Sequence, residues 1–145
     1  LFRSVSQTAW NILSSQGYAM DKLVTYFTEM WAQFHRHHSH METHIHPRGA
    51  QISAFYFLTV PEDGCKMVIH DPRPTKVMVN LPEQDNTQIT PASQHIVLTP
   101  SVGMMIFTNS WLPHSFTKNG NLLPTRFVHM NLGVMFGETP QVEVI

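Results

Sequence analysis

The chain has 145 residues, of which 42% are hydrophobic and 13% charged, and its formal net charge is −1 with neutral histidines. This length suits one domain with a sizeable core, so we expect residues 1–145 to form a single domain. The near-neutral balance argues against binding to nucleic acid or to a membrane surface, and no apolar run approaches the ~20 residues that span a bilayer. The single cysteine, Cys65, cannot form a disulfide within the chain, which favours a reducing, cytoplasmic location.

Residues 1–16 are predicted to form a helix, because apolar residues recur on one face and Gly17 follows as a stop. Residues 22–34 fit a helical face by spacing, but their content of Val, Thr, Tyr, Phe and Trp favours a strand. From residue 42 onward, short apolar segments alternate with Pro and Gly, which predicts strands at 42–46, 51–59, 66–70, 94–98, 103–108 and 124–135.

The segment Ile52–Leu58 is apolar on both faces, which is typical of a strand in the middle of a packed pair of sheets. Several short strands at regular spacing predict a mainly β fold, a double-stranded β-helix (a jelly roll, cupin-like), with an N-terminal helix. The stretch 71–93 contains four prolines and little periodicity. We expect it to be a long loop, and loops of that length are often functional.

The chain contains ten histidines, and six of them lie between His35 and His46. Histidine is the commonest metal ligand among side chains. In a strand, His44 and His46 would point to the same face and could hold one metal ion together. His114, which follows the predicted strand 103–108, is the best candidate for a third ligand. Three protein ligands on one side of an ion leave positions open for a co-substrate and oxygen.

Arg126 lies inside the predicted apolar strand 124–135. An arginine buried there needs an anionic partner, and its planar guanidinium matches a carboxylate through two parallel hydrogen bonds. The next acid along the chain is Glu138. A bound dicarboxylate would supply the missing partner.

The order His44-x-His46, His114 and Arg126 across a predicted jelly roll resembles the 2-oxoglutarate/Fe(II)-dependent oxygenase superfamily. The likeness is closest to the prolyl-hydroxylase-like branch and to small phage-borne oxygenase-like proteins, and it covers residues 23–135. The segments that carry it are 31–46, 52–58, 70–73 and 111–114.

This resemblance implies an enzyme, a dioxygenase that couples 2-oxoglutarate decarboxylation to hydroxylation of an unidentified substrate, with a protein or peptide among the candidates. The implied cofactor is Fe(II), and the implied small-molecule co-substrate is 2-oxoglutarate. The phage likeness implies action in a host cytoplasm. The resemblance implies that His44, His46 and His114 bind the metal. It also implies that Arg126 binds the distal carboxylate of 2-oxoglutarate and that Ser53 or Tyr56 orients this carboxylate.

His46 departs from the family pattern, which normally has Asp or Glu at this position. An acid would lower the net charge of a ferrous site to about +1, whereas a third neutral imidazole leaves it near +2. Imidazole still suits iron. Glu42, which shares strand parity with His44, and Asp71 are alternative acidic ligands.

Other readings of these residues stay open. The segment 35–40 is interpreted as a solvated turn, and His70, His95 and His129 as structural. Asp71-Pro72-Arg73 is either a turn with a local salt bridge or a catalytic element. Two competing functions are a cupin-like three-His dioxygenase that uses no keto acid, and a non-enzymatic jelly-roll module whose histidines hold zinc in a closed shell.

Overall fold

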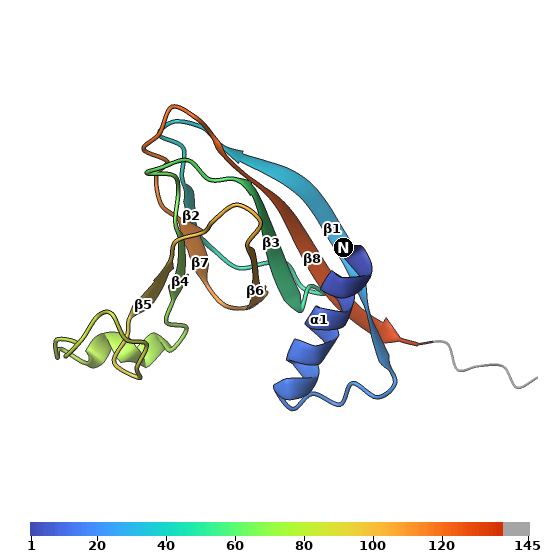
Figure 1. Ribbon diagram of the computed structural model, residues 1–145. Helices are drawn as coiled ribbons and strands as arrows, with labels where there is room; N and C mark the ends of the chain where they lie inside the picture. Colours follow the sequence, from blue (N-terminus) through green and yellow to red (C-terminus); the bar gives the residue numbers. More distant parts are fainter. Residues whose placement is uncertain (138–145) are drawn as a thin grey trace, which may run out of the picture.

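The computed structural model describes residues 1–137. Within them the chain forms one α-helix, one 3-10 helix and eight strands (Figure 1). The elements in chain order are α1 (Phe2–Ser15), β1 (Leu23–His35), β2 (Met41–His44), β3 (Ile52–Thr59), β4 (Met67–His70), η1 (Pro74–Met78), β5 (His95–Leu98), β6 (Met105–Asn109), β7 (His114–Phe116) and β8 (Thr125–Phe136).

The strands form two four-stranded sheets, which we call the major sheet (order β1-β8-β3-β6) and the minor sheet (order β2-β7-β4-β5). All strand pairs are antiparallel. Apart from β4 and β5, which are neighbours in the minor sheet, successive strands alternate between the two sheets, which is the connectivity of a jelly roll. The predicted fold class, including the N-terminal helix, is therefore confirmed.

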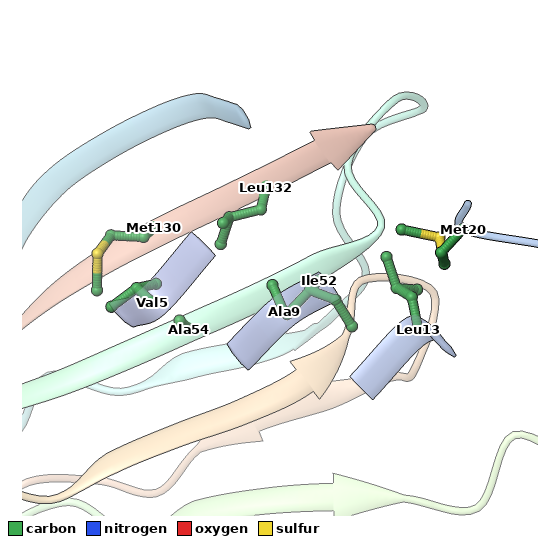
Figure 2. Packing of buried hydrophobic residues seen from close by; sticks show 8 residues of the cluster. All are labelled: Val5, Ala9, Leu13, Met20, Ile52, Ala54, Met130 and Leu132. Carbon is green, nitrogen blue, oxygen red and sulfur yellow. The ribbon is translucent and has the colours of Figure 1, made fainter. Parts of the chain in front are cut away.

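Helix α1 covers the outer face of the major sheet. Its buried residues Val5, Ala9 and Leu13 recur every four positions and pack on β3 and β8 (Figure 2). The Trp10 indole donates to the carbonyl of Leu23 at 2.9 Å, which ties the helix to β1. Gly17 adopts φ 93°, a conformation that favours glycine, and the helix ends just before it.

A second cluster of buried apolar residues fills the space between the two sheets. The major sheet contributes Phe55, Phe57 and Phe127, and the minor sheet contributes Met67 and Phe116. Strand β3 therefore has apolar neighbours on both faces, as its sequence predicted, and it lies between β8 and β6. We call the face of each sheet that points into this space the inner face.

The predicted elements agree with the structure except for strand β7, which begins at His114. The ambiguous segment 22–34 is strand β1. Strand β7, only three residues long, was missed because so short a segment after Pro113 has no detectable periodicity. The long loop 71–93 is present and carries the 3-10 helix η1. No helix among residues 1–137 has the length and apolarity needed to cross a lipid bilayer.

Candidate metal centre

The structure brings His44, His46 and His114 together between the sheets. One ring nitrogen from each lies within 4.8 Å of the others, and no other such group of three occurs among residues 1–137. His44 at the end of β2 is directly opposite His114 at the start of β7. His46 lies just beyond β2, where its backbone N–H donates to the carbonyl of Ser110 at 2.9 Å. Two strands and one anchored turn therefore position the three imidazoles.

Backbone carbonyls orient two of these rings. His44 Nδ1 lies 2.8 Å from the Glu42 carbonyl oxygen, and His114 Nδ1 lies 2.9 Å from that of Leu112. A carbonyl can only accept, so each Nδ1 carries the proton and each Nε2 keeps its lone pair. Metal-binding histidines are held in this way in other proteins, because the hydrogen bond selects the tautomer and fixes the ring.

The spacing of the nitrogens suits one ion. His46 Nε2 lies 3.1 Å from His114 Nε2. Two nitrogens about 2.1 Å from one metal, at a right angle, are separated by about 3 Å. The two rings therefore have the separation of neighbouring ligands on one ion.

Burial keeps two of these imidazoles neutral at pH 7. It lowers the pKa of His114 and of His46 to about 4, and the charge of neighbouring rings adds to the effect at both. A metal ligand has to be deprotonated. At neutral pH these two rings are therefore ready to bind a cation.

His129 is a fourth histidine beside this cluster, and the sequence had indicated a structural role for it. It lies on the inner face of β8, 2% exposed, with its ring centroid 4.6 Å from that of His46. Trp31 covers one side of the ring at 4.1 Å, and Phe55 lies at 4.4 Å. Its Nε2 is buried without a hydrogen-bond partner in the part of the chain that the structure describes. Such an atom costs about 1–3 kcal/mol unless something pairs with it.

Several buried polar side chains near the inner face of the major sheet are hydrogen-bonded to one another. Ser53 Oγ donates to Asn131 Oδ1 at 2.8 Å and lies 3.0 Å from Ser110 Oγ. Asn131 Nδ2 in turn donates to Glu29 Oε2 at 2.9 Å, at the exposed edge strand β1. Ser110 also accepts the backbone hydrogen bond of His46. Ser53 thus lies on the inner face of β3 and is linked through Ser110 to the turn that carries His46.

Arg126 does not lie at this site, which corrects the expectation for it. Side chains alternate along β8, so Phe127 and His129 point inward while Arg126 points outward. Arg126 is exposed, and its guanidinium lies over the ring of Phe34, 5.4 Å from the centroid. The same alternation places Tyr56 on the outer face of β3, against the cluster under α1.

The remaining polar candidates are engaged elsewhere. Glu42 is exposed and lies 2.9 Å from His40, and Asp71 forms an ion pair with Arg73 at 2.7 Å, so neither joins the three imidazoles. The Asp71-Pro72-Arg73 turn is thus the local salt bridge that the sequence allowed. His35, interpreted as part of a solvated turn, is instead buried against Phe116 and Phe127.

Comparisons with known proteins agree with this architecture. A family model described as "Putative 2OG-Fe(II) oxygenase" matches residues 29–125. The crystal structure of an oxidoreductase of the 2OG-Fe(II) oxygenase family from Burkholderia pseudomallei is similar, with a TM-score of 0.60 and 13% identity over 85% of this chain and 56% of that chain. The non-heme alpha ketoglutarate dependent epimerase SnoN from nogalamycin biosynthesis gives a TM-score of 0.55 and 12% identity over 97% of this chain and 61% of that one.

At such identities the likeness concerns the fold, and the chain spans less than two thirds of the length of either protein. A search of curated protein sequences found no match.

Proposed function

Because this chain belongs to the 2OG-Fe(II) oxygenase family, we propose that it is a non-haem Fe(II) oxygenase that couples decarboxylation of 2-oxoglutarate to hydroxylation of a substrate. The observation that carries the proposal is the convergence of His44, His46 and His114 on one point between the sheets. Three neutral ligands on one side of an ion leave positions for a chelating co-substrate and oxygen.

The residues present fit a ferrous ion. His44 and His114 present Nε2 lone pairs in orientations held by backbone carbonyls, and His46 Nε2 lies at ligand spacing from His114. When bound, Fe(II) and 2-oxoglutarate supply the redox chemistry that activation of oxygen and hydroxylation of a C–H bond require. The aromatic wall formed by Phe55, Phe116 and Phe127 keeps water away from one side of the site.

The inner face also fits the polar end of a co-substrate, through residues other than Arg126. The His129 ring, whose Nε2 has no partner among residues 1–137, lies beside the His46 ring, and Ser53 and Asn131 lie on the same inner face. We assign the His129 ring and the second amide hydrogen of Asn131 to hydrogen-bond the keto acid, with Ser53 orienting the Asn131 amide through its own hydrogen bond. They carry no formal charge when His129 is neutral, so they would bind a carboxylate less tightly than an arginine does.

An anaerobic titration with Fe(II) and 2-oxoglutarate tests the proposal. We expect the weak visible charge-transfer band of a keto acid chelate, together with a rise in melting temperature on adding 2-oxoglutarate to the iron-loaded protein. His44→Ala combined with His114→Ala should abolish the band and metal binding. His40→Ala is the matched control, because His40 is exposed and lies outside the cluster. Absence of both the band and the stabilisation would exclude the proposed function.

His46→Asp tests the unusual ligand. An acid at this position lowers the charge of a ferrous site, so we expect iron to bind more tightly to this variant. Unchanged iron affinity would mean that His46 does not contact the metal.

A second candidate function follows from the three-imidazole set. With neither an acidic ligand nor Arg126 at the site, the protein would be a three-His dioxygenase whose substrate itself binds the metal. The titration separates the two functions, since in this case Fe(II) binds but 2-oxoglutarate produces neither a band nor stabilisation.

A further inference from the structure

A cavity of about 270 Å³ lies at the end of the minor sheet, under the long loop 71–93. Its floor consists of Ile69, Ile96 and Leu112, all of which belong to or pack on the cluster between the sheets. Its wall includes Ile89, Thr90 and Ser93 of the loop. The cavity is smaller than the roughly 300 Å³ at which pockets for drug-sized ligands begin. It has room for a single side chain or a small ring.

Two residues of the cavity floor, Ile69 and Ile96, lie in the same row across the minor sheet as His44 and His114. Across the minor sheet, His44 is paired with His114, His114 with Ile69, and Ile69 with Ile96. Paired residues on neighbouring strands point to the same face, and strands are spaced by about 4.8 Å. Ile69 is therefore about 5 Å and Ile96 about 10 Å along the sheet from His114.

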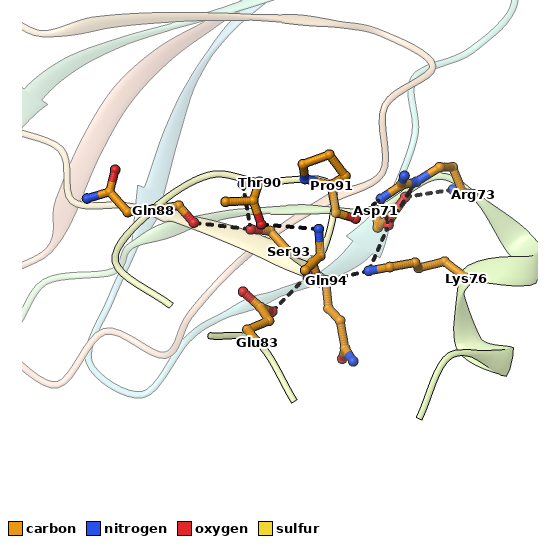
Figure 3. Close-up of polar contacts among 10 residues, drawn as sticks. Asp71, Arg73, Lys76, Glu83, Gln88, Thr90, Pro91, Ser93 and Gln94 are labelled. Atoms are coloured by element: carbon orange, nitrogen blue, oxygen red, sulfur yellow. Dashed lines mark hydrogen bonds and ion pairs between the residues drawn. The ribbon is translucent and has the colours of Figure 1, made fainter. Parts of the chain in front are cut away.

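The loop over the cavity is held in place at its base. Arg73 Nη2 donates to the Pro91 carbonyl at 2.9 Å, and Lys76 Nζ donates to that of Ala92 at 2.8 Å (Figure 3). Farther along, Ser93 Oγ accepts from the Thr90 backbone N–H at 3.1 Å. The bonds from Arg73 and Lys76 join the two ends of the loop, so the wall is formed before a ligand arrives, and binding requires little ordering.

The two charged groups that line the cavity, Asp71 and Arg73, pair with each other; Lys76, which faces Asp71 at 3.7 Å, does not line it. The Arg73 guanidinium contacts both carboxylate oxygens of Asp71, through Nε and Nη2 at 2.7–3.1 Å. His70 Nε2 lies 2.8 Å from Ser115 Oγ, and burial and the neighbouring His95 lower its pKa. A charged ligand would lose water here without gaining a counter-ion. The lining therefore favours a neutral group.

We propose that this cavity is the substrate pocket of the oxygenase site, and that it takes a neutral, apolar group of about the size of one amino-acid side chain. The inference rests on the proposed function, because it names what the metal centre would hydroxylate. The bound group lies on the face that carries the metal ligands, one to two strands from His114.

The test uses the full chain loaded with Co(II) in the presence of 2-oxoglutarate, with Zn(II) as the diamagnetic reference. The probes are N-acetyl-leucinamide and 3-methyl-1-butanol, which share an isobutyl group, and N-acetyl-aspartamide as the anionic counterpart. Broadening by a paramagnetic ion falls steeply with distance. We expect the isobutyl methyl resonances of the neutral probes to broaden with Co(II) and not with Zn(II), and the anionic probe to be unaffected. Tighter binding of N-acetyl-leucinamide than of the alcohol would indicate a peptide source for the group.

Two matched variants locate the binding site. Ile89→Glu places a charge in the cavity wall, whereas Met78→Glu places one on the same loop outside the cavity, and the two residues are 71% and 82% exposed. Such exposed positions tolerate a charge without unfolding. We expect Ile89→Glu to weaken binding of the neutral probes at least fivefold and Met78→Glu to change it less than twofold.

The proposal is overturned if no probe is broadened, if the anionic probe binds equally well, or if the two variants behave alike. The keto acid band reports on the proposed function separately. If the band forms but no probe is broadened, the proposed substrate pocket is wrong and the proposed oxygenase function stands. If the band is absent, both proposals are wrong.

Discussion

Acid should destabilise the metal-free protein strongly between pH 6.5 and pH 4. In the folded chain, burial among neighbouring rings lowers the pKa of His46 and His114 to about 4 and that of His129 to about 3, from a usual value of 6.5. Between pH 6.5 and pH 4 the unfolded chain therefore binds more protons than the folded chain. The stability is fully present above pH 6.5 and is lost as the pH falls through this window.

The size of the loss follows from these values. At pH 5 an unfolded histidine is almost fully protonated, while each of the three folded rings is almost fully neutral, so each costs about 2 kcal/mol of unfolding free energy. The rings share one site, and part of each shift comes from the others, so the total is below the sum, at roughly 3–5 kcal/mol. A domain of this size has about 5–15 kcal/mol of stability. Much of it should thus be gone by pH 5.

Urea denaturation of the metal-free protein at pH 7, 6 and 5 measures this loss. His129→Phe keeps an aromatic ring between Trp31 and Phe55 and should reduce the difference between pH 7 and pH 5 by about 2 kcal/mol. Equal stability at pH 7 and pH 5, or an unchanged difference in His129→Phe, would refute a neutral, buried histidine cluster. Zn(II) should raise the stability at pH 7 and lose this effect in acid, because protons compete for the same nitrogens.

Three further substitutions test the placement of residues around the site. Arg126→Ala should leave 2-oxoglutarate binding unchanged and cost about 0.5–1 kcal/mol, the value of an exposed cation–π contact; loss of the keto acid band would return Arg126 to the site. Gly133→Ala should lower the unfolding free energy by roughly 1–3 kcal/mol and weaken metal binding. The reason is that a Cβ there would lie 2.7 Å from the Gly49 carbonyl, in the turn that follows His46. Equal metal affinity by calorimetry would mean that this turn does not help to position His46. Asn119→Ala should cost about 2–4 kcal/mol in urea denaturation, because its buried amide donates to the carbonyls of His35 at 2.8 Å and Leu123 at 3.0 Å; a loss below 1 kcal/mol would mean that water replaces these bonds.

The sequence by itself determined the fold class, most strands and the three imidazoles. Their signals are local: His44 and His46 share a face because strand side chains alternate, and Pro and Gly mark the ends of strands. The convergence of His114 on them was predicted from chain order and is seen in the structure. The central position of β3 was readable because both of its faces are apolar.

Only the tertiary structure decided which face of β8 points toward the cluster of His44, His46 and His114. Alternation divides β8 into two sets, one with Arg126 and the other with His129, but it does not say which set points inward. In most sheets the apolar set identifies the core. Here α1 covers the outer face, so both sets contain buried apolar residues such as Phe127 and Met130, and the pattern is ambiguous. Packing of α1 on one side and of the minor sheet on the other turned His129 toward His46 and Arg126 toward solvent.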